Sequence, residues 1–152
     1  MDKKRKKLII IVSSVGESMY PLIINGNKLY IKVSEKPNYQ VGDIIAYIRD
    51  GQLIAHRLIK ITKDAGKTNY LFKGDNNPGI DSYVKKQAII GKVEKVISGR
   101  SIINLTNRRN TFLKYFMLAY SFLNLRHPIF FHLNKLYKVP IIKSIYSLIV
   151  DN

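Results

Sequence analysis

The apolar positions of this chain fall into short runs that are separated by turn residues. The runs are rich in Ile, Val and Tyr, and Gly, Asn, Asp and Pro stand between them, which is typical of β-strands joined by tight turns. We predict strands over residues 8–15, 28–33, 43–48, 52–61, 69–73 and 88–97. Asp50-Gly51 separates two of these runs and predicts a two-residue hairpin that pairs them. The pattern therefore indicates a mainly β domain over residues 8–105.

The pattern changes after residue 105, where turn residues become rare and aromatic residues gather. Residues 112–125 are apolar almost all round and predict a helix of about 14 residues, whereas a membrane span requires about 20. A second helical pattern follows Pro128, with apolar residues on one face and Lys elsewhere. Such helices are typical of segments that lie in a membrane interface. We expect residues 106–152 to form an α-helical tail on a membrane; the alternative is that the helices pack on the domain or on a partner protein.

The chain begins with a basic run, residues 1–7, which precedes the apolar run 8–15. Together they resemble a signal peptide, but eight apolar residues are too few to cross a bilayer core about 30 Å thick. No small-residue cleavage site follows them, and their β-branched side chains favour a buried strand. We therefore expect a solvated basic arm (1–7), a β-rich domain (8–105) and a helical tail (106–152).

The formal net charge of +16 requires an anionic partner or extensive solvation. The chain has no helix-turn-helix or zinc-finger signature and no aromatic ribonucleoprotein motif, so an anionic membrane surface is favoured over nucleic acid. There is no cysteine, which excludes disulfides and thiolate metal ligands. The three histidines form no His-x-x-x-His pair, and we expect no zinc site.

Gly16-Glu17-Ser18-Met19-Tyr20-Pro21 is the first candidate for chemistry. A strand that delivers a serine into a tight bend places the hydroxyl at the rim of a sheet on a rigid backbone, as a nucleophile requires. The alternative is an ordinary turn at the end of a strand, in which the serine has no special role.

Two other stretches carry the groups that would activate such a serine. His56 lies within an apolar strand pattern and is the candidate general base, although a lone histidine in such a pattern is also common in protein cores. Asp75 and Asp81 lie in or beside a turn rich in Gly, Asn and Pro, and either carboxylate could orient the imidazole. Asp75 can instead accept backbone N–H groups of its own turn, which leaves Asp81 freer to reach the histidine.

These three stretches, in this order, resemble the motifs of the type I signal peptidases, within the wider group of serine peptidases that includes the LexA-type self-cleaving repressors. The Gly-x-Ser-Met-Tyr-Pro sequence is similar to the nucleophile motif of Gram-positive members. His56 stands where most bacterial members have lysine, in a setting similar to the archaeal and endoplasmic-reticulum branch. The Gly-Asp-Asn-Asn turn followed by Asp81 also resembles that branch. The resemblance covers residues 8–98 and implies a mainly β peptidase fold.

The resemblance implies Ser18 as nucleophile, His56 as general base, Asp81 as third catalytic residue and Asp75 in a supporting role. The Ser18 backbone N–H is the expected oxyanion donor, and Gly16 stands where many relatives have a second donor, a hydroxyl. We expect an extended peptide to bind beside Met19, Leu53, Ile54 and Ala55. Arg57 and Lys60 are expected to point away from the site, and Glu17 to face solvent.

The sequence thus predicts a serine endopeptidase that removes a leader or signal segment through an acyl-enzyme, without a cofactor. Its expected partners are a peptide or preprotein and a membrane surface, on the cytoplasmic side. The alternatives are a self-processing, LexA-like regulator and a non-catalytic peptide-binding protein. A regulator of that kind would require a DNA-binding module ahead of Ser18, and we expect none.

Overall fold

The computed structural model describes residues 8–107 and 110–126. The predicted basic arm and the helical pattern after Pro128 lie outside these residues. The described strands are β1 (Leu8–Ser13), β2 (Lys28–Val33), β3 (Ile44–Arg49), β4 (Gln52–Asp64), β5 (Lys67–Lys73), β6 (Tyr83–Lys85), β7 (Ile89–Ser98) and β8 (Ser101–Asn104). A short 3-10 helix, η1 (Lys86–Ala88), precedes β7, and an α-helix, α1 (Asn110–Arg126), follows β8.

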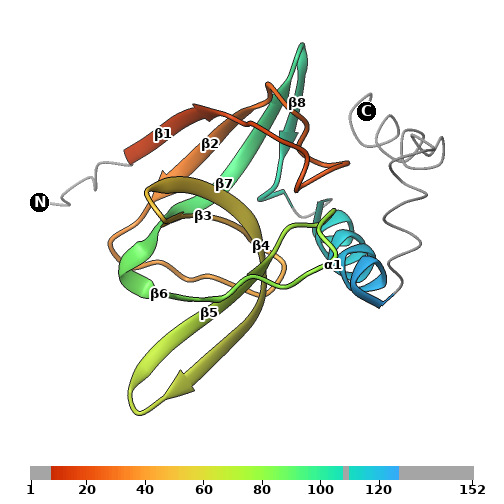
Figure 1. Cartoon of the computed structure of the whole chain (residues 1–152). Helices are drawn as coiled ribbons and strands as arrows, with labels where there is room; N and C mark the ends of the chain where they lie inside the picture. The colour runs from red at the N-terminus through yellow and green to blue at the C-terminus, as the bar shows by residue number, and fades with distance from the viewer. Residues whose placement is uncertain (1–7, 108–109, 127–152) are drawn as a thin grey trace, which may run out of the picture.

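The strands form one antiparallel sheet in the order β1-β2-β7-β3-β4-β5-β6, and β8 pairs with β7 beside this path. The sheet is strongly curved, and α1 lies against one side of it (Figure 1). The mainly β fold with a C-terminal helix is therefore confirmed. Every predicted strand has an observed counterpart, with ends that differ by a few residues. The expectation that residues 8–15 form a buried strand is wrong, because β1 lies at the edge of the sheet and most of its side chains are exposed. The sequence did not predict β6 or β8, which are only three and four residues long.

The β3–β4 hairpin forms at the predicted dipeptide. Asp50 and Gly51 both have positive φ angles, 51° and 75°, as a tight hairpin turn between twisted strands requires. The resulting register places Ile45 opposite His56. β4 is long, and it pairs through its first half with β3 and through its second half with β5, with an irregularity between Leu58 and Lys60. His56 therefore lies in the middle of the sheet, near the point where β4 changes partner.

The interior consists of two apolar clusters. The larger one joins the inner faces of β2, β7 and β3 to Met19, Leu22 and Ile23 in the loop after β1. Leu113, Met117 and Tyr120 add one face of α1 to this cluster. The smaller one joins β3, β4, β5 and β6 around Tyr47 and Phe72. Because α1 contributes buried side chains, it belongs to the folded core.

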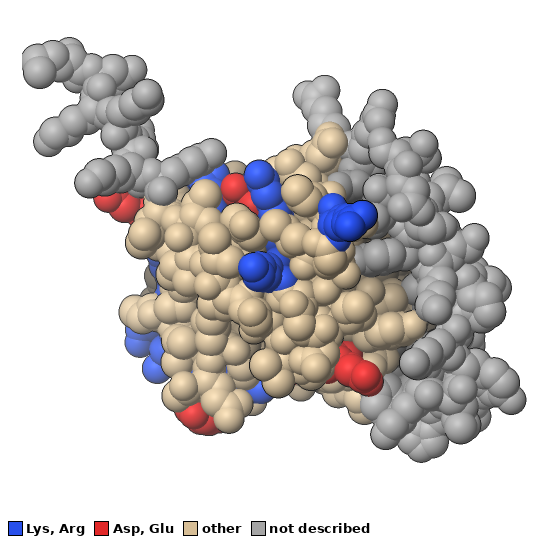
Figure 2. Space-filling model, turned by 90° about the horizontal axis from the view of Figure 1, so that it is seen from above, with Lys and Arg blue, Asp and Glu red and all other residues tan. Residues whose placement is uncertain are grey.

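The opposite face of α1 is apolar as well, although it is not covered by the described residues. Phe112 is 76% exposed and Tyr115 is 58% exposed, and Phe122 and Leu123 lie on the surface too. Within the described part of the chain, no helix has the length and apolar character that crossing a bilayer requires. Figure 2 shows one face of the molecule, on which Lys and Arg form several separate groups, with a few Asp and Glu residues, among uncharged residues.

Candidate active site

Ser18 lies in the loop between β1 and β2, whose base is closed by backbone hydrogen bonds. The Ser14 N–H donates to the Asn27 carbonyl, and the Gly26 N–H donates to the Ser14 carbonyl. Gly16 has a φ of +88°, a conformation that other residues rarely adopt, and it turns the chain just before the serine. Met19 is buried in the core while Ser18 is half-buried and Glu17 is exposed. The buried neighbour anchors the loop and leaves the hydroxyl of Ser18 at its rim.

The turn over residues 74–77 holds this loop from the other side. The Asn76 N–H donates to the Ser18 carbonyl at 2.8 Å, and the Asn76 side-chain amide donates to the Glu17 carbonyl at 3.2 Å. The fit is close, because a Cβ added to Gly74 would lie 2.8 Å from the Ser18 carbonyl oxygen. Two segments far apart in the sequence are thereby joined at the serine.

Ser18, His56 and Asp81 form one hydrogen-bonded row. His56 Nε2 lies 2.9 Å from Ser18 Oγ, and His56 Nδ1 lies 2.6 Å from Asp81 Oδ2. The carboxylate requires a proton on Nδ1, and Nε2 is then free to accept the hydrogen bond of the serine hydroxyl. His56 is only 6% exposed. The arrangement can move a proton from the hydroxyl to the imidazole and stabilise the imidazolium that results.

Asp81 receives two further interactions from β3. The Tyr47 hydroxyl donates to Asp81 Oδ2 at 2.9 Å, and Arg49 Nη1 lies 3.4 Å from Asp81 Oδ1. Burial raises the pKa of the Asp81 carboxyl, but the hydrogen bond and charge of His56, the Tyr47 hydroxyl and the Arg49 guanidinium together hold this pKa below its usual value. The carboxylate is therefore ionised over the neutral range.

Asp75 binds a different cation. Arg57 Nε donates to Asp75 Oδ1 at 2.7 Å and Arg57 Nη2 to Asp75 Oδ2 at 2.6 Å, a bidentate pair in which both side chains are almost fully buried. Arg57 lies on the opposite face of β4 from His56 and so points away from the site, as expected. It is not a solvated residue, however, because the guanidinium is enclosed by the sheet and the Asp75 turn. Lys60 and Glu17 are exposed, as expected.

An open cleft of about 620 Å³ begins at the hydroxyl of Ser18 and the ring of His56. The end of β1 and the loop that follows it form one wall, and residues 52–55 of β4 form the other. All four residues predicted to contact a peptide, Met19, Leu53, Ile54 and Ala55, line this cleft. No Asp, Glu, Lys or Arg among the described residues lines it, and most of its walls are apolar. The cleft is thus suited to an extended, uncharged segment of peptide.

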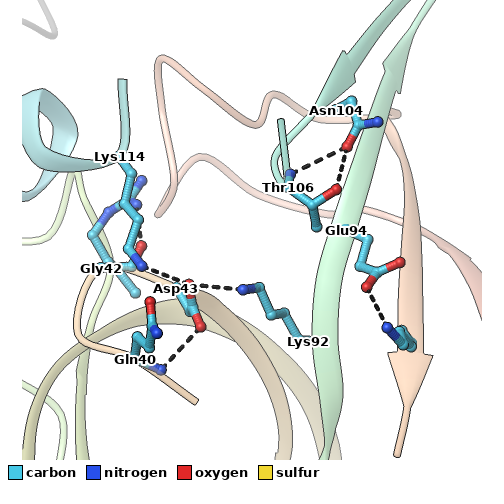
Figure 3. Close-up of polar contacts among 10 residues, drawn as sticks. Gln40, Gly42, Asp43, Lys92, Glu94, Asn104, Thr106 and Lys114 are labelled. Atoms are coloured by element: carbon cyan, nitrogen blue, oxygen red, sulfur yellow. Dashed lines mark hydrogen bonds and ion pairs between the residues drawn. The ribbon is translucent and has the colours of Figure 1, made fainter. Parts of the chain in front are cut away.

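A second polar cluster lies on the side of the sheet that faces α1 (Figure 3). Asp43 is 4% exposed and contacts Lys92 Nζ at 3.0 Å and Lys114 Nζ at 2.9 Å. The neighbouring Gly42 carbonyl accepts a hydrogen bond from Arg57 Nη1 at 2.7 Å. Through residues 42 and 43, the helix residue Lys114 is therefore connected to the arginine that follows His56 in the chain.

Lys73 provides another connection to α1. Its ammonium group is buried and donates to the Gly74 carbonyl and to Ser121 Oγ, both at 3.1 Å. Burial lowers the pKa of Lys73 to about 8, a shift that the carboxylates of Asp75 and Asp81 partly oppose. This lysine directly precedes the turn that holds the Ser18 loop.

Sequence reasoning missed Tyr47, Arg49 and Asn76 as neighbours of the site. A signal for the first two was present, because the Asp50-Gly51 hairpin sets the register in which position 45 faces His56. Positions two and four residues further along β3 share that face, so Tyr47 and Arg49 lie on the same side of the sheet as the imidazole. No comparable signal existed for Asn76, whose contacts depend on the folded turn.

Comparison with known proteins finds relatives that are named as signal peptidases. The signal peptidase complex catalytic subunit SEC11 of Candida tropicalis is 30% identical over 120 aligned residues, which cover 72% of each chain. The human subunit SEC11C is 26% identical over 72% of this chain and 62% of its own length. Signal peptidase I W of Bacillus subtilis is 32% identical over 72 residues, 46% of this chain and 38% of the bacterial protein. No family model matches the sequence.

Proposed function

This chain belongs to the type I signal peptidase family, and from that premise we propose that it is a serine endopeptidase that removes a leader or signal segment from a peptide or preprotein. The observation that carries the proposal is the row of hydrogen bonds from Ser18 Oγ through His56 to Asp81, at 2.9 and 2.6 Å, which opens into an apolar cleft. A serine nucleophile requires a base at this distance and an orienting group beyond it.

Acylation begins when Ser18 Oγ attacks the scissile carbonyl while His56 Nε2 takes the hydroxyl proton. The negative charge moves to the carbonyl oxygen, to which the Ser18 backbone N–H is expected to donate a hydrogen bond. The tetrahedral intermediate collapses as the C–N bond breaks, and His56 gives its proton to the leaving amine. The leader segment is now an ester of Ser18. Water, deprotonated by His56, attacks this ester and releases the leader with a new carboxyl group.

The two carboxylates have different roles in this mechanism. Asp81 holds the Nδ1–H tautomer of His56 and stabilises the imidazolium that forms in each half-reaction. Asp75 neutralises the buried Arg57, and the turn in which it lies supplies the Asn76 N–H that holds the Ser18 carbonyl. Asp81 is thus the third catalytic residue, and Asp75 supports the site through the backbone.

The substrate enters as an extended strand along residues 52–55 of β4, with its scissile carbonyl at Ser18. Leu53 lies at the rim of the cleft and is 41% exposed, whereas Ile54 and Ala55 are half-buried in its wall. Charged side chains next to the cut are disfavoured, because the described cleft offers no opposite charge to pair with them.

The outward face of α1 rests on a membrane surface on the cytoplasmic side. Phe112, Tyr115 and Phe122 present aromatic side chains to solvent on that face, while Lys114 at its edge is tied to Asp43. Aromatic residues at this kind of surface insert at the level of lipid headgroups, and a basic protein is attracted to anionic lipids.

Incubating the purified full-length chain with candidate precursor peptides and weighing the products tests the proposal. We expect the wild type to give two products, and Ser18→Ala and His56→Ala each to lower the cleavage rate by at least about 10³-fold. Ser82→Ala is the matched control, because Ser82 is exposed in the loop beside Asp81 and should leave the rate unchanged. Cleavage by Ser18→Ala at the wild-type rate would eliminate the proposal, and binding without cleavage by the wild type would identify a peptide-binding protein.

A further inference from the structure

Tyr47 occupies a position in the site that core packing alone does not explain. We propose that Tyr47, together with Arg49, is a positioning residue that fixes the Asp81 carboxylate in the orientation that His56 requires. The inference rests on the proposed peptidase function and extends its site from three side chains to five. All the contacts involved come from two adjacent strands, β3 and β4, and from one loop.

Asp81 requires such support because it lies on a loop rather than in the sheet. It is located between β5 and β6, and its exposed neighbours Ile80 and Ser82 provide no packing that could hold it. Its backbone N–H donates to the Phe72 carbonyl at 2.9 Å, which places the main chain but leaves the side chain free to rotate. Loops are more mobile than the elements that they connect.

The contacts of the carboxylate remove this freedom. Oδ2 accepts hydrogen bonds from both Tyr47 Oη and His56 Nδ1, and Oδ1 faces Arg49 Nη1. A rotation of the carboxylate that kept one of these interactions would break the others. The group is therefore held in the plane in which Oδ2 meets the imidazole, which is the geometry that catalysis requires.

Tyr47 itself is rigid. Its side chain is fully buried, and its ring stacks on Phe72 with centroids 4.5 Å apart and an interplanar angle of 17°. The ring also meets His56 edge-on at 6.4 Å. Burial, followed by the charge of Asp81, raises the pKa of the Tyr47 hydroxyl well above its usual value, so the group remains a donor at every pH of interest.

The groups around Asp81 predict the direction in which the pH dependence of kcat/KM should change when Tyr47 or Arg49 is replaced. His56 on β4, Tyr47 and Arg49 on β3 and the ammonium group of Lys73 on β5 all interact with this carboxylate. The Tyr47 hydroxyl and the Arg49 charge both lower the pKa of the Asp81 carboxyl, so removing either should raise this pKa. The acid limb of the pH dependence of kcat/KM should therefore move to higher pH in both variants.

The test compares Tyr47→Phe with Tyr70→Phe in the full-length enzyme and one precursor peptide. Tyr70 is also buried and also stacks near Phe72, with centroids 6.5 Å apart, but no hydrogen bond joins it to the Ser18–His56–Asp81 row in the described structure. We expect Tyr47→Phe to lower kcat/KM about 10-fold to 100-fold, the cost of one hydrogen bond to a charged group, and to move the acid limb upward. Tyr70→Phe should do neither.

Substitutions of Arg49 provide a second test of the inference. Arg49→Gln should move the acid limb in the same direction, and Arg49→Lys should restore it, since only the charge is needed at 3.4 Å. Circular dichroism and urea unfolding establish that each variant is folded. An unchanged acid limb in folded Tyr47→Phe and Arg49→Gln would overturn the inference. Ser18→Ala separates this failure from a failure of the proposed function, because that variant must lose cleavage whether or not Tyr47 has a role.

Discussion

His56 and Arg57 are consecutive residues of β4, and each binds a different carboxylate of the same connecting segment. His56 Nδ1 lies 2.6 Å from Asp81, and Arg57 makes the bidentate pair with Asp75. Successive side chains of a strand point to opposite faces, so the segment that carries the two aspartates is held on both sides of the sheet. This pairing explains why the carboxylate that binds the imidazole is Asp81, although Asp75 lies within the turn that holds Ser18.

The two carboxylates should therefore respond differently to the same substitution. Asp81→Asn should lower the free energy of unfolding by a smaller amount than Asp75→Asn, because the interactions that hold the Asp81 pKa below its usual value include the partly exposed Arg49. It should lower kcat by about 10³-fold to 10⁴-fold, because the amide favours the wrong tautomer of His56. Asp75→Asn should lower the free energy of unfolding by about 3 kcal/mol or more, because it leaves the buried guanidinium of Arg57 uncompensated. Urea unfolding and steady-state kinetics of both variants measure the contrast. A reversed pattern, with stability lost in Asp81→Asn and activity lost alone in Asp75→Asn, would exchange the two roles.

Gly74 should be required for the position of the nucleophile. A Cβ at this position would lie 2.8 Å from the Ser18 carbonyl oxygen and 2.7 Å from the Asn77 amide nitrogen, so Gly74→Ala must displace one of the two segments. We expect kcat/KM to fall about 100-fold, since a shift of about 1 Å at a nucleophile has an effect of this size. Gly79→Ala is the matched control in the same loop, because nothing lies within 4 Å of its added Cβ. Equal activity of the two variants would show that the turn does not position Ser18.

Lys73 should make stability depend on pH in the alkaline range. Burial lowers its pKa from 10.5 to about 8, so between these values the unfolded chain binds more protons than the folded one, and stability rises with pH. The free-energy difference between wild type and Lys73→Met should therefore change by about 3 kcal/mol across this window, in favour of the wild type as pH rises, and should be constant below it. Urea unfolding at a series of pH values provides the measurement. A difference that stays flat up to pH 10.5 would exclude a lowered pKa.

The exposed face of α1 should control binding to lipid. Replacing Phe112 and Phe122 with Ser removes two aromatic side chains from this face without touching the buried positions 113 and 117. We expect sedimentation with anionic vesicles to fall at least about 10-fold, while neutral vesicles bind weakly in all cases. Ile102→Ser is the control, because Ile102 is 62% exposed but belongs to strand β8 and not to α1. Unchanged sedimentation of the double variant would contradict a role of α1 in membrane binding.

Much of the fold could be predicted because its signals are local. β-Branched runs, the Asp50-Gly51 turn and the aromatic helix after residue 110 are each encoded within a few residues. The short strands β6 and β8 could not be predicted in this way, since each exists only because a neighbouring strand supplies its partner.

The three central residues of the site could be predicted from the sequence, whereas the burial of a neighbouring charge could not. Ser18, His56 and Asp81 were proposed from motif order and resemblance, and the structure brings their polar atoms within hydrogen-bond distance. The burial of Arg57 could not be read from the strand pattern, because a charged residue at an alternating position normally indicates a solvated face. It is buried here because Asp75 and the Gly42 carbonyl compensate its charge from segments distant in the sequence.

The mass of the acyl-enzyme tests the central claim most directly. The full-length protein is mixed with a precursor peptide, quenched in acid within milliseconds to seconds, digested and analysed by mass spectrometry. The account predicts a transient adduct on the peptide that contains Ser18, with the mass of the leader segment less one water, and no adduct in Ser18→Ala. Product formation without any adduct, together with equal cleavage by Ser18→Ala, would contradict it.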